Sequence, residues 1–275
     1  MRQLIAVAAA ALVLAGGAAR ADSVEIRDAA ARVVIIPENR RDVRVEVMSR
    51  NPRLPLTIRT AKGRTLVDGN LDRRIRDCHE RDGAMIVDVG GVGPVRYADL
   101  PQVVIRTPMD VAVSAGGAVF GDVGRSASLS LASAGCGRWT IANVRGVLKL
   151  DQAGSGEIRA GGAASARIRG AGSGDIQAGA VRGPLSVDLA GSGDIAADAV
   201  QGALKVNVAG SGDVDVPAGE VAEMDAVIAG SGDVRFGGVA ARLKARIAGS
   251  GDVVVRRVTG RVDKTVMGSG AVRIG

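Results

Sequence analysis

A hexapeptide of the form Ala-Gly-Ser-Gly-Asp-Ile/Val recurs along the C-terminal part of the chain. Its second residue is glycine in every copy, and successive copies are 18, 19, 19, 20, 19 and 19 residues apart. These glycines are Gly154, Gly172, Gly191, Gly210, Gly230, Gly249 and Gly268. A period held within one residue over seven copies is typical of a repeat protein, in which each copy is one supersecondary unit that stacks on the next.

Apolar residues alternate with polar ones between these glycine-rich corners. In the copy that starts at Ala190 the apolar positions are Ile195, Ala197, Val200, Leu204, Val206 and Val208. Strict alternation is the pattern of a strand with one buried face. Glycine at a corner allows backbone angles that are closed to other residues. Each repeat is therefore predicted to form two short strands joined by two turns.

A two-strand unit cannot bury its apolar face alone, but stacked copies can. The sequence therefore predicts an all-β fold: a single-stranded, right-handed parallel β-helix, or solenoid, with ~19-residue rungs and an irregular N-terminal β lead-in. The main alternative is a β-propeller. Propeller repeats run to about 40 residues with aromatic signatures, whereas only 1% of this chain is aromatic.

Three segments are expected along the chain. Residues 1–21 resemble a secretory signal peptide, with Arg2, an apolar stretch from Leu4 to Gly17, and Ala19-Arg20-Ala21 as a small-x-small cleavage site. The alternative is a membrane anchor, but the apolar stretch is short for a membrane span. We expect an exported protein, in the periplasm or at the cell surface, with no transmembrane segment after cleavage.

Residues 22–114 are expected to form the β lead-in and the polar cap of the solenoid, and residues 115–275 its regular repeats. Solenoids need such a cap to stay soluble. Short strands are predicted at 24–27, 32–36, 43–47, 56–60 and 85–89. The charged stretch from Leu71 to Gly83 is interpreted as an excursion containing one helical turn.

The corners and the lead-in together carry a family resemblance. The Gly-Ser-Gly-Asp-Ile/Val corners follow a lead-in that includes Val43-Arg44-Val45-Glu46-Val47, behind a signal peptide. This combination resembles the head GIN domain family of auto-transporter adhesins, which are β-solenoids of bacterial envelopes. The resemblance covers most of the chain after residue 21. It implies adhesion, and the family offers no catalytic residues to transfer.

In-register stacking would align the acidic residues of the corners in one column. They are Glu157, Asp175, Asp194, Asp213, Asp233 and Asp252. Neighbouring carboxylates ~4.8 Å apart repel by about 1 kcal/mol in water, so something should offset the repulsion. The preferred interpretation is that turn amides and the neighbouring serine hydroxyls donate to each carboxylate. The alternative is a divalent cation such as Ca²⁺, which seeks carboxylate oxygens; no other cofactor or metal is expected.

Composition argues against nucleic-acid binding and against most enzymes. The net charge of +7 is spread along the chain, which has one Trp, one Tyr and two Phe. A nucleic-acid binder would concentrate cations and aromatics on one face. The only histidine, His79, has no Gly-x-Ser-x-Gly elbow nearby, and Gly-Lys-Ser/Thr is absent. A carbohydrate-active β-helix enzyme would need a cleft with paired acids and an aromatic side chain.

Cys78 and Cys136 are the only cysteines. An exported protein meets an oxidising compartment, so a disulfide between them is predicted. Two cysteines without a cluster of further ligands do not indicate a zinc site.

The function predicted from these features is that of a non-catalytic, exported envelope solenoid that presents a repetitive surface to an envelope protein or a surface glycan. Two alternatives stay open: a periplasmic structural or cation-binding solenoid, and a carbohydrate-active enzyme. Val272 and Ile274 fall in an incomplete last rung, and an open strand edge is a template for pairing. Self-association through residues 253–275 is therefore also expected.

Overall fold

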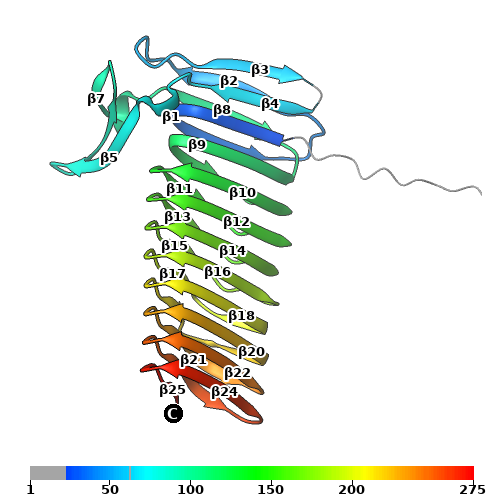
Figure 1. Cartoon of the computed structure of the whole chain (residues 1–275). Coiled ribbons are helices and arrows are strands. Elements are labelled where there is room, and N and C mark those ends of the chain that lie inside the picture. Colours follow the sequence, from blue (N-terminus) through cyan, green and yellow to red (C-terminus); the bar gives the residue numbers. More distant parts are fainter. Residues whose placement is uncertain (1–22, 62) are drawn as a thin grey trace, which may run out of the picture.

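The computed structural model describes residues 23–61 and 63–275, so the signal peptide predicted at 1–21 lies outside the described residues. Within them, parallel strands stack in successive coils and form a β-solenoid of about nine turns (Figure 1). The prediction of an all-β solenoid is confirmed.

Two walls of parallel strands run along the regular part. The longer strands form the first wall: β10 (Ser128–Gly135), β12 (Val147–Gly154), β14 (Ser165–Gly172), β16 (Leu185–Gly191), β18 (Val200–Gly210), β20 (Gly219–Gly230), β22 (Leu243–Gly249) and β24 (Val262–Gly268). Shorter strands form the second wall: β11 (Arg138–Ile141), β13 (Glu157–Ala160), β15 (Ile176–Ala178), β17 (Ile195–Ala197), β19 (Val214–Val216), β21 (Val234–Ala240), β23 (Val253–Val258) and β25 (Val272–Ile274).

Each strand pairs with the equivalent strand of the next rung, in register. Leu185 pairs with Leu204 in the first wall, and Ile176 pairs with Ile195 in the second. A third side closes each coil. In the earlier repeats it has only single bridges such as Val181 to Val200, and from Val200 onward β18, β20 and β21 extend into it and pair there. Residues at equivalent repeat positions therefore lie above one another in columns.

The alternating apolar residues fill the interior as predicted. All six apolar positions of the rung that starts at Ala190 are at most 2% exposed. The intervening residues face outward, with Lys205 exposed and Asn207 half-buried. The Asn207 amide donates to the carboxylate of Asp188 on the preceding rung at 2.7 Å. The predicted register of the strands is confirmed.

The corners depend on glycine at two positions. Gly191 has a φ of +137°, which L side chains rarely adopt, and a Cβ there would stand 2.1 Å from the carbonyl oxygen of Gly172. A Cβ on Gly212, the second corner glycine of the next rung, would stand 2.0 Å from the carbonyl oxygen of Gly193. Both distances are far below van der Waals contact, so neither glycine has room for a side chain.

The lead-in forms the N-terminal end of the solenoid. Its strands are β1 (Ser23–Pro37), β2 (Arg44–Ser49), β3 (Thr57–Ala61), β4 (Arg64–Asp68), β8 (Gln102–Thr107) and β9 (Asp110–Val123). β1 pairs in parallel with β4, β8 and β9, while β2 and β3 add antiparallel partners to β8 and β4. Arg27 of β1 donates to Asp68 of β4 at 2.7 Å, and this bond holds the pKa of Asp68 below its usual value.

Two segments of the lead-in differ from the prediction. The strands expected at 24–27 and 32–36 are one strand, β1, with a register shift between Ile26 and Ala29. The excursion at 71–83 contains the expected single turn, the 3₁₀ helix η1 (Asp72–Arg74), but the remainder is mostly strand. β5 (Ile75–Arg81), β6 (Ala84–Val89) and β7 (Gly93–Arg96) form a separate antiparallel sheet, followed by η2 (Tyr97–Asp99). We call β5–β7 the flap sheet; it projects sideways from the solenoid (Figure 1).

The residues of β5 are mostly polar and exposed, so they lack the alternation of apolar and polar residues from which a strand could be predicted. The apolar residues that hold it come from β6 and β7, where Val87 and Val95 are at most 1% exposed. Tertiary pairing therefore decides the conformation of β5.

The register can be tested with a matched pair of substitutions. Leu204→Asn places an unpartnered amide in the interior and removes apolar contacts, so it should lower the free energy of unfolding by about 3–5 kcal/mol. Lys205→Asn changes an outward-facing residue and should stay within about 0.5 kcal/mol of wild type. Thermal and urea denaturation followed by circular dichroism measure both. Equal losses in the two variants would contradict the register.

A second pair tests the stacking of the corners. Gly212→Ala forces the rungs apart and should lower the free energy of unfolding by roughly 1–3 kcal/mol. Ser211→Ala, at the neighbouring exposed position, should be nearly silent in the same urea titration. A Gly212→Ala variant as stable as wild type would show that the rungs are not in close contact at this corner.

Candidate functional site

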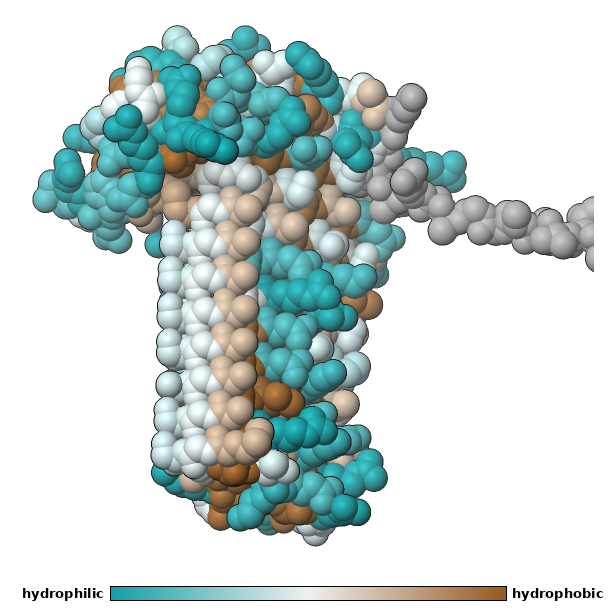
Figure 2. All heavy atoms as spheres, in the orientation of Figure 1, coloured by the Kyte–Doolittle hydropathy of each residue, from teal (hydrophilic) through white to brown (hydrophobic). Residues whose placement is uncertain are grey.

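The corners form a flat face with small side chains. Figure 2 shows straight stripes of small residues running down the solenoid, which correspond to the repeated Ala, Gly and Ser positions of the corners. Rungs stacked in register give this face straight columns of side chains. An open hollow of about 510 Å³ lies beside its N-terminal end and is lined in part by Ala134, Ala153 and Ala171.

The acidic column beside these stripes serves the backbone. Oδ1 of Asp175 accepts the amide N–H of Asp194 on the next rung at 2.9 Å. The same bond recurs at 2.8–2.9 Å down the column, from the amides of Asp213, Asp233, Asp252 and Ala271. Turn amides were expected to donate to each carboxylate, and the amides that donate to the aspartates belong to the following rung. Among the described side-chain bonds, Ser250 pairs with Ser231 and not with an acid.

Arginines contact part of the same column. Arg235 donates to Asp213 at 3.2 Å and to Asp233 at 2.7 Å, and Arg273 lies 2.9 Å from Asp252. Glu157 lies between Arg138 and Arg159. Amide hydrogen bonds and arginine pairs together offset the repulsion between neighbouring carboxylates.

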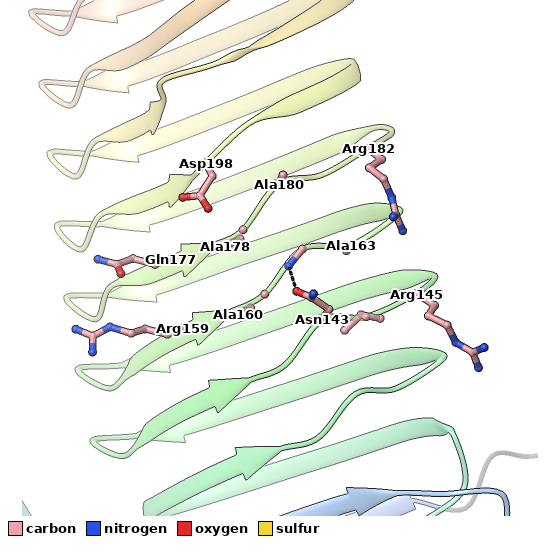
Figure 3. A pocket seen from close by; sticks show the side chains of 14 residues that line it. Asn143, Arg145, Arg159, Ala160, Ala163, Gln177, Ala178, Ala180, Arg182 and Asp198 are labelled. Carbon is pink, nitrogen blue, oxygen red and sulfur yellow. Dashed lines mark hydrogen bonds between the residues drawn. The ribbon is translucent and has the colours of Figure 1, made fainter.

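A shallow depression of about 660 Å³ lies on the third side of the coils. Small residues form its floor, and Asn143 accepts the N–H of Gly162 at 2.9 Å across it. Figure 3 shows that Arg145 and Arg182 extend away from one end, and Arg159 from the other. These charged groups do not converge on a shared point, so this depression is a poor ligand site.

The flap sheet and the solenoid wall enclose a different cleft, of about 560 Å³. Side chains of contrasting chemistry line it from both sides: Glu80, Met85 and Arg96 from the flap sheet, Tyr97 from η2, and Phe120, Asp122, Arg138 and Thr140 from β9 and β11. Clefts that combine apolar surface with a few polar groups are the usual ligand sites of proteins. We take this cleft as the candidate functional site.

Tyr97 is the aromatic side chain that the cleft presents to solvent. Its ring meets the Phe120 ring edge-on, with centroids 5.2 Å apart and an interplanar angle of 84°. The Arg32 guanidinium lies 5.4 Å from the Tyr97 centroid. Both contacts are favourable for an aromatic ring and fix its orientation. Tyr97 is nevertheless 39% exposed, so part of this fixed ring is available to a ligand.

Charges of both signs accompany the ring. Arg138 is already paired with Glu157 at 3.0 Å. Within the described part of the chain, Glu80, Arg96 and Asp122 have no ion-pair partner in their surroundings. These three side chains are free to donate to or accept from a polar ligand.

The flap sheet is fixed against the solenoid by a small core of its own. Val87, Val89 and Val95 pack against Ala118 and Phe120 of β9 and are almost fully buried with them. Arg74 reinforces the base of the sheet, since its Nε donates to the carbonyl of Gly90 at 2.8 Å. The cleft is therefore preformed.

A disulfide joins the flap sheet to the wall. Cys78 of β5 and Cys136 at the end of β10 form an S–S bond of 2.06 Å with their Cα atoms 5.8 Å apart. The structure also brings His79 together with Asp77 and Asp88, with ligand atoms within 4.8 Å of one another. Sequence reasoning missed both this cluster and the cleft: the cluster joins two strands of the flap sheet, and the cleft joins the flap sheet to β9 and β11. Tyr97, Ala98 and Asp99 form a single short turn, so no repeating pattern in the sequence indicates that Tyr97 belongs to a site.

No helix in the described part of the chain is long and apolar enough to cross a membrane.

The family model described as "Putative auto-transporter adhesin, head GIN domain" matches residues 95–218 and, in a second match, residues 183–275. No curated protein matches the chain. The family match includes Tyr97, Phe120 and Asp122 of the cleft.

Solved structures resemble the chain to different degrees. The crystal structure of a "Putative lipid binding protein" from Parabacteroides distasonis ATCC 8503 aligns with a TM-score of 0.53 at 16% identity, covering 93% of this chain and 92% of that one. A "putative adhesin" from the same organism aligns with a TM-score of 0.47 at 16% identity, covering 93% and 94%. At this identity the first likeness shows the fold alone.

Removing the disulfide tests how the flap sheet is held. The chain-entropy model assigns about 4 kcal/mol to a crosslink between residues 58 apart. The double variant Cys78→Ser/Cys136→Ser should therefore unfold at lower urea concentration, and trypsin should cut it faster at Arg76 and Arg81. Reduced wild-type protein should behave like the double variant, which itself should not respond to reductant. Unchanged unfolding and proteolysis in both would contradict a role for this crosslink.

Proposed function

The chain belongs to this head GIN domain family, and on that basis we propose that it is a non-catalytic, exported envelope protein that binds a surface glycan in the cleft beneath its flap sheet. The solenoid is the rigid support, and the cleft is the place where its surface departs from repetition. The observation that carries the proposal is the fixed, 39% exposed ring of Tyr97 beside charged groups that pair with no other charge among the described residues.

A glycan fits the chemistry of this cleft. The C–H faces of a sugar ring pack on an aromatic ring, as apolar groups do on Tyr. Its hydroxyls both donate and accept hydrogen bonds, so they can pair with Arg96 on one side and with Glu80 or Asp122 on the other. Because Phe120 and Arg32 already hold the ring of Tyr97, binding would cost little side-chain ordering.

One feature of the cleft favours a second candidate function. Glu80 and Asp122 both line it together with Tyr97, and pairs of carboxyl groups perform glycoside hydrolysis. A carbohydrate-active enzyme therefore remains the alternative. The two functions differ in their product, since a binding protein releases its glycan unchanged.

Binding to a panel of immobilised bacterial-envelope and host-surface glycans tests the proposal. Tyr97→Ala should weaken binding at least about tenfold, which corresponds to about 1.4 kcal/mol, because the stacking surface is lost. Tyr97→Phe keeps the ring and should stay within about threefold of wild type. Ser192→Ala, on the flat corner face, is the control and should bind like wild type.

Two results would contradict the proposal. Equal binding by wild type and Tyr97→Ala would place the ligand elsewhere, and a wild-type protein that binds only proteins would exclude a glycan as ligand. Chromatography of the released glycan separates binding from catalysis. Shortened products that disappear in Glu80→Gln or Asp122→Asn would identify the enzyme.

A further inference from the structure

Three potential metal ligands meet on one side of the flap sheet. β5 supplies Asp77 and His79, and β6 supplies Asp88, which is the cross-strand partner of Asp77. His79 lies two residues from Asp77 along an extended strand, so the two side chains point to the same face. The antiparallel pairing adds Asp88 to that face.

The distances between their ligand atoms suit a small metal ion. His79 Nδ1 lies 3.2 Å from Asp77 Oδ2 and 3.6 Å from Asp88 Oδ2. One ligand atom from each of the three residues lies within 4.8 Å of the others. Bonds of about 2.0–2.2 Å at tetrahedral angles place neighbouring ligand atoms about 3.3–3.6 Å apart.

The surroundings leave the negative charge of the pair unbalanced. Two carboxylates directly opposite each other on paired strands destabilise a sheet. No arginine or lysine in the described residues forms an ion pair with Asp77 or Asp88; the side chain that lies within 4 Å of both is His79. Oδ1 of Asp77 accepts the backbone N–H of Cys78 at 2.8 Å, whereas the acidic column of the solenoid has arginines as well as amides to offset its charge.

The imidazole itself lacks partners. Both ring nitrogens of His79 are shielded from solvent and have no hydrogen-bond partner of acceptable geometry in the described part of the chain. Buried polar atoms usually have a partner, so an orphaned pair indicates that something further belongs at the site. A metal ion bound to Nδ1 satisfies one nitrogen and both carboxylates at once.

We propose that Asp77, His79 and Asp88 bind a divalent first-row transition ion of the zinc class. One imidazole nitrogen and two carboxylate oxygens are a ligand set for such ions, whereas Ca²⁺ and Mg²⁺ prefer oxygen alone. The Cys78 sulfur is held in the disulfide and is not a ligand. The Asp77 side chain is 64% exposed, which leaves the ion open to solvent and to a fourth ligand.

The ion would crosslink β5 to β6. His79 precedes Glu80, which lines the cleft and pairs with Met85 across the same two strands. A bound ion would therefore stiffen one wall of the cleft, but the metal site stands on its own residues and does not depend on glycan binding.

Direct titration of the untagged full chain, stripped with EDTA, tests the site. Calorimetry with ZnCl₂ should show one ion per chain, and Co²⁺ should give the visible absorption of a low-symmetry site. His79 is the only histidine, so its imidazole signals in ¹⁵N NMR are assigned without ambiguity and should shift with the first equivalent of zinc.

Substitutions identify the ligands. His79→Ala and Asp88→Asn should each weaken zinc binding by more than about 100-fold, since removal of mere supporting groups already costs about 10–100-fold. Asp82→Asn is the matched control: it removes the same charge from the exposed tip of the same hairpin, at a φ of +53° that Asn tolerates. It should bind zinc like wild type, and circular dichroism should show all three variants folded.

Several results would overturn the proposal. Zinc binding that persists in folded His79→Ala would place the ion on other acidic residues. Wild-type zinc binding no stronger than that of Asp88→Asn would remove Asp88 from the ligand set and so contradict the three-residue site. Imidazole signals of His79 that acid shifts but zinc leaves unchanged would mean that a proton and not a metal occupies the site. Tight binding of Ca²⁺ with no response to zinc would exclude the transition-metal class.

Discussion

At each corner of the solenoid, the backbone of one rung lies against that of the next, closer than any side chain would allow. A Cβ on Gly191 would stand 2.1 Å from the carbonyl oxygen of Gly172. This approach lets the amide of Ser192 donate to the same carbonyl at 2.9 Å. The aspartate column repeats the bond beside it, because each carboxylate accepts an amide of the next rung. The register of both walls depends on these contacts.

The same regularity limits what the walls can do. When each rung repeats the one before it, the surface consists of straight columns, and a cleft enclosed between two elements requires a break in the repetition. The flap sheet supplies that break, since it leaves the solenoid between β4 and β8 and returns to pack Val87 and Val95 against β9. Its buried valines, the disulfide and the hydrogen bond of Arg74 fix its position. Rigid positioning of a cleft favours ligand recognition because little ordering remains for the ligand to impose.

Charge is arranged differently in the two parts of the molecule. Along the acidic column of the solenoid, each aspartate accepts an amide of the next rung, Arg235 pairs with two of them, and Glu157 lies between two arginines. On the flap sheet, no arginine or lysine among the described residues pairs with Asp77, Asp88 or Glu80; Asp77 accepts one amide, from Cys78, and His79 lies beside both aspartates. Uncompensated groups in a fixed geometry tend to mark functional sites. The flap sheet therefore carries both the proposed glycan site and the proposed metal site.

The sequence by itself determined the solenoid, because its period, its alternation and its corner glycines are local signals that each rung repeats. Leu204 and Val206 were assigned to the interior on alternation alone, and both are at most 1% exposed. The lead-in contains no repeated pattern, so its strands could not be predicted by comparing successive copies. That β5 is a strand, that Tyr97 meets Phe120, and that Asp88 joins Asp77 and His79 were decided by tertiary structure alone, because each depends on pairing or packing between segments that carry no shared pattern.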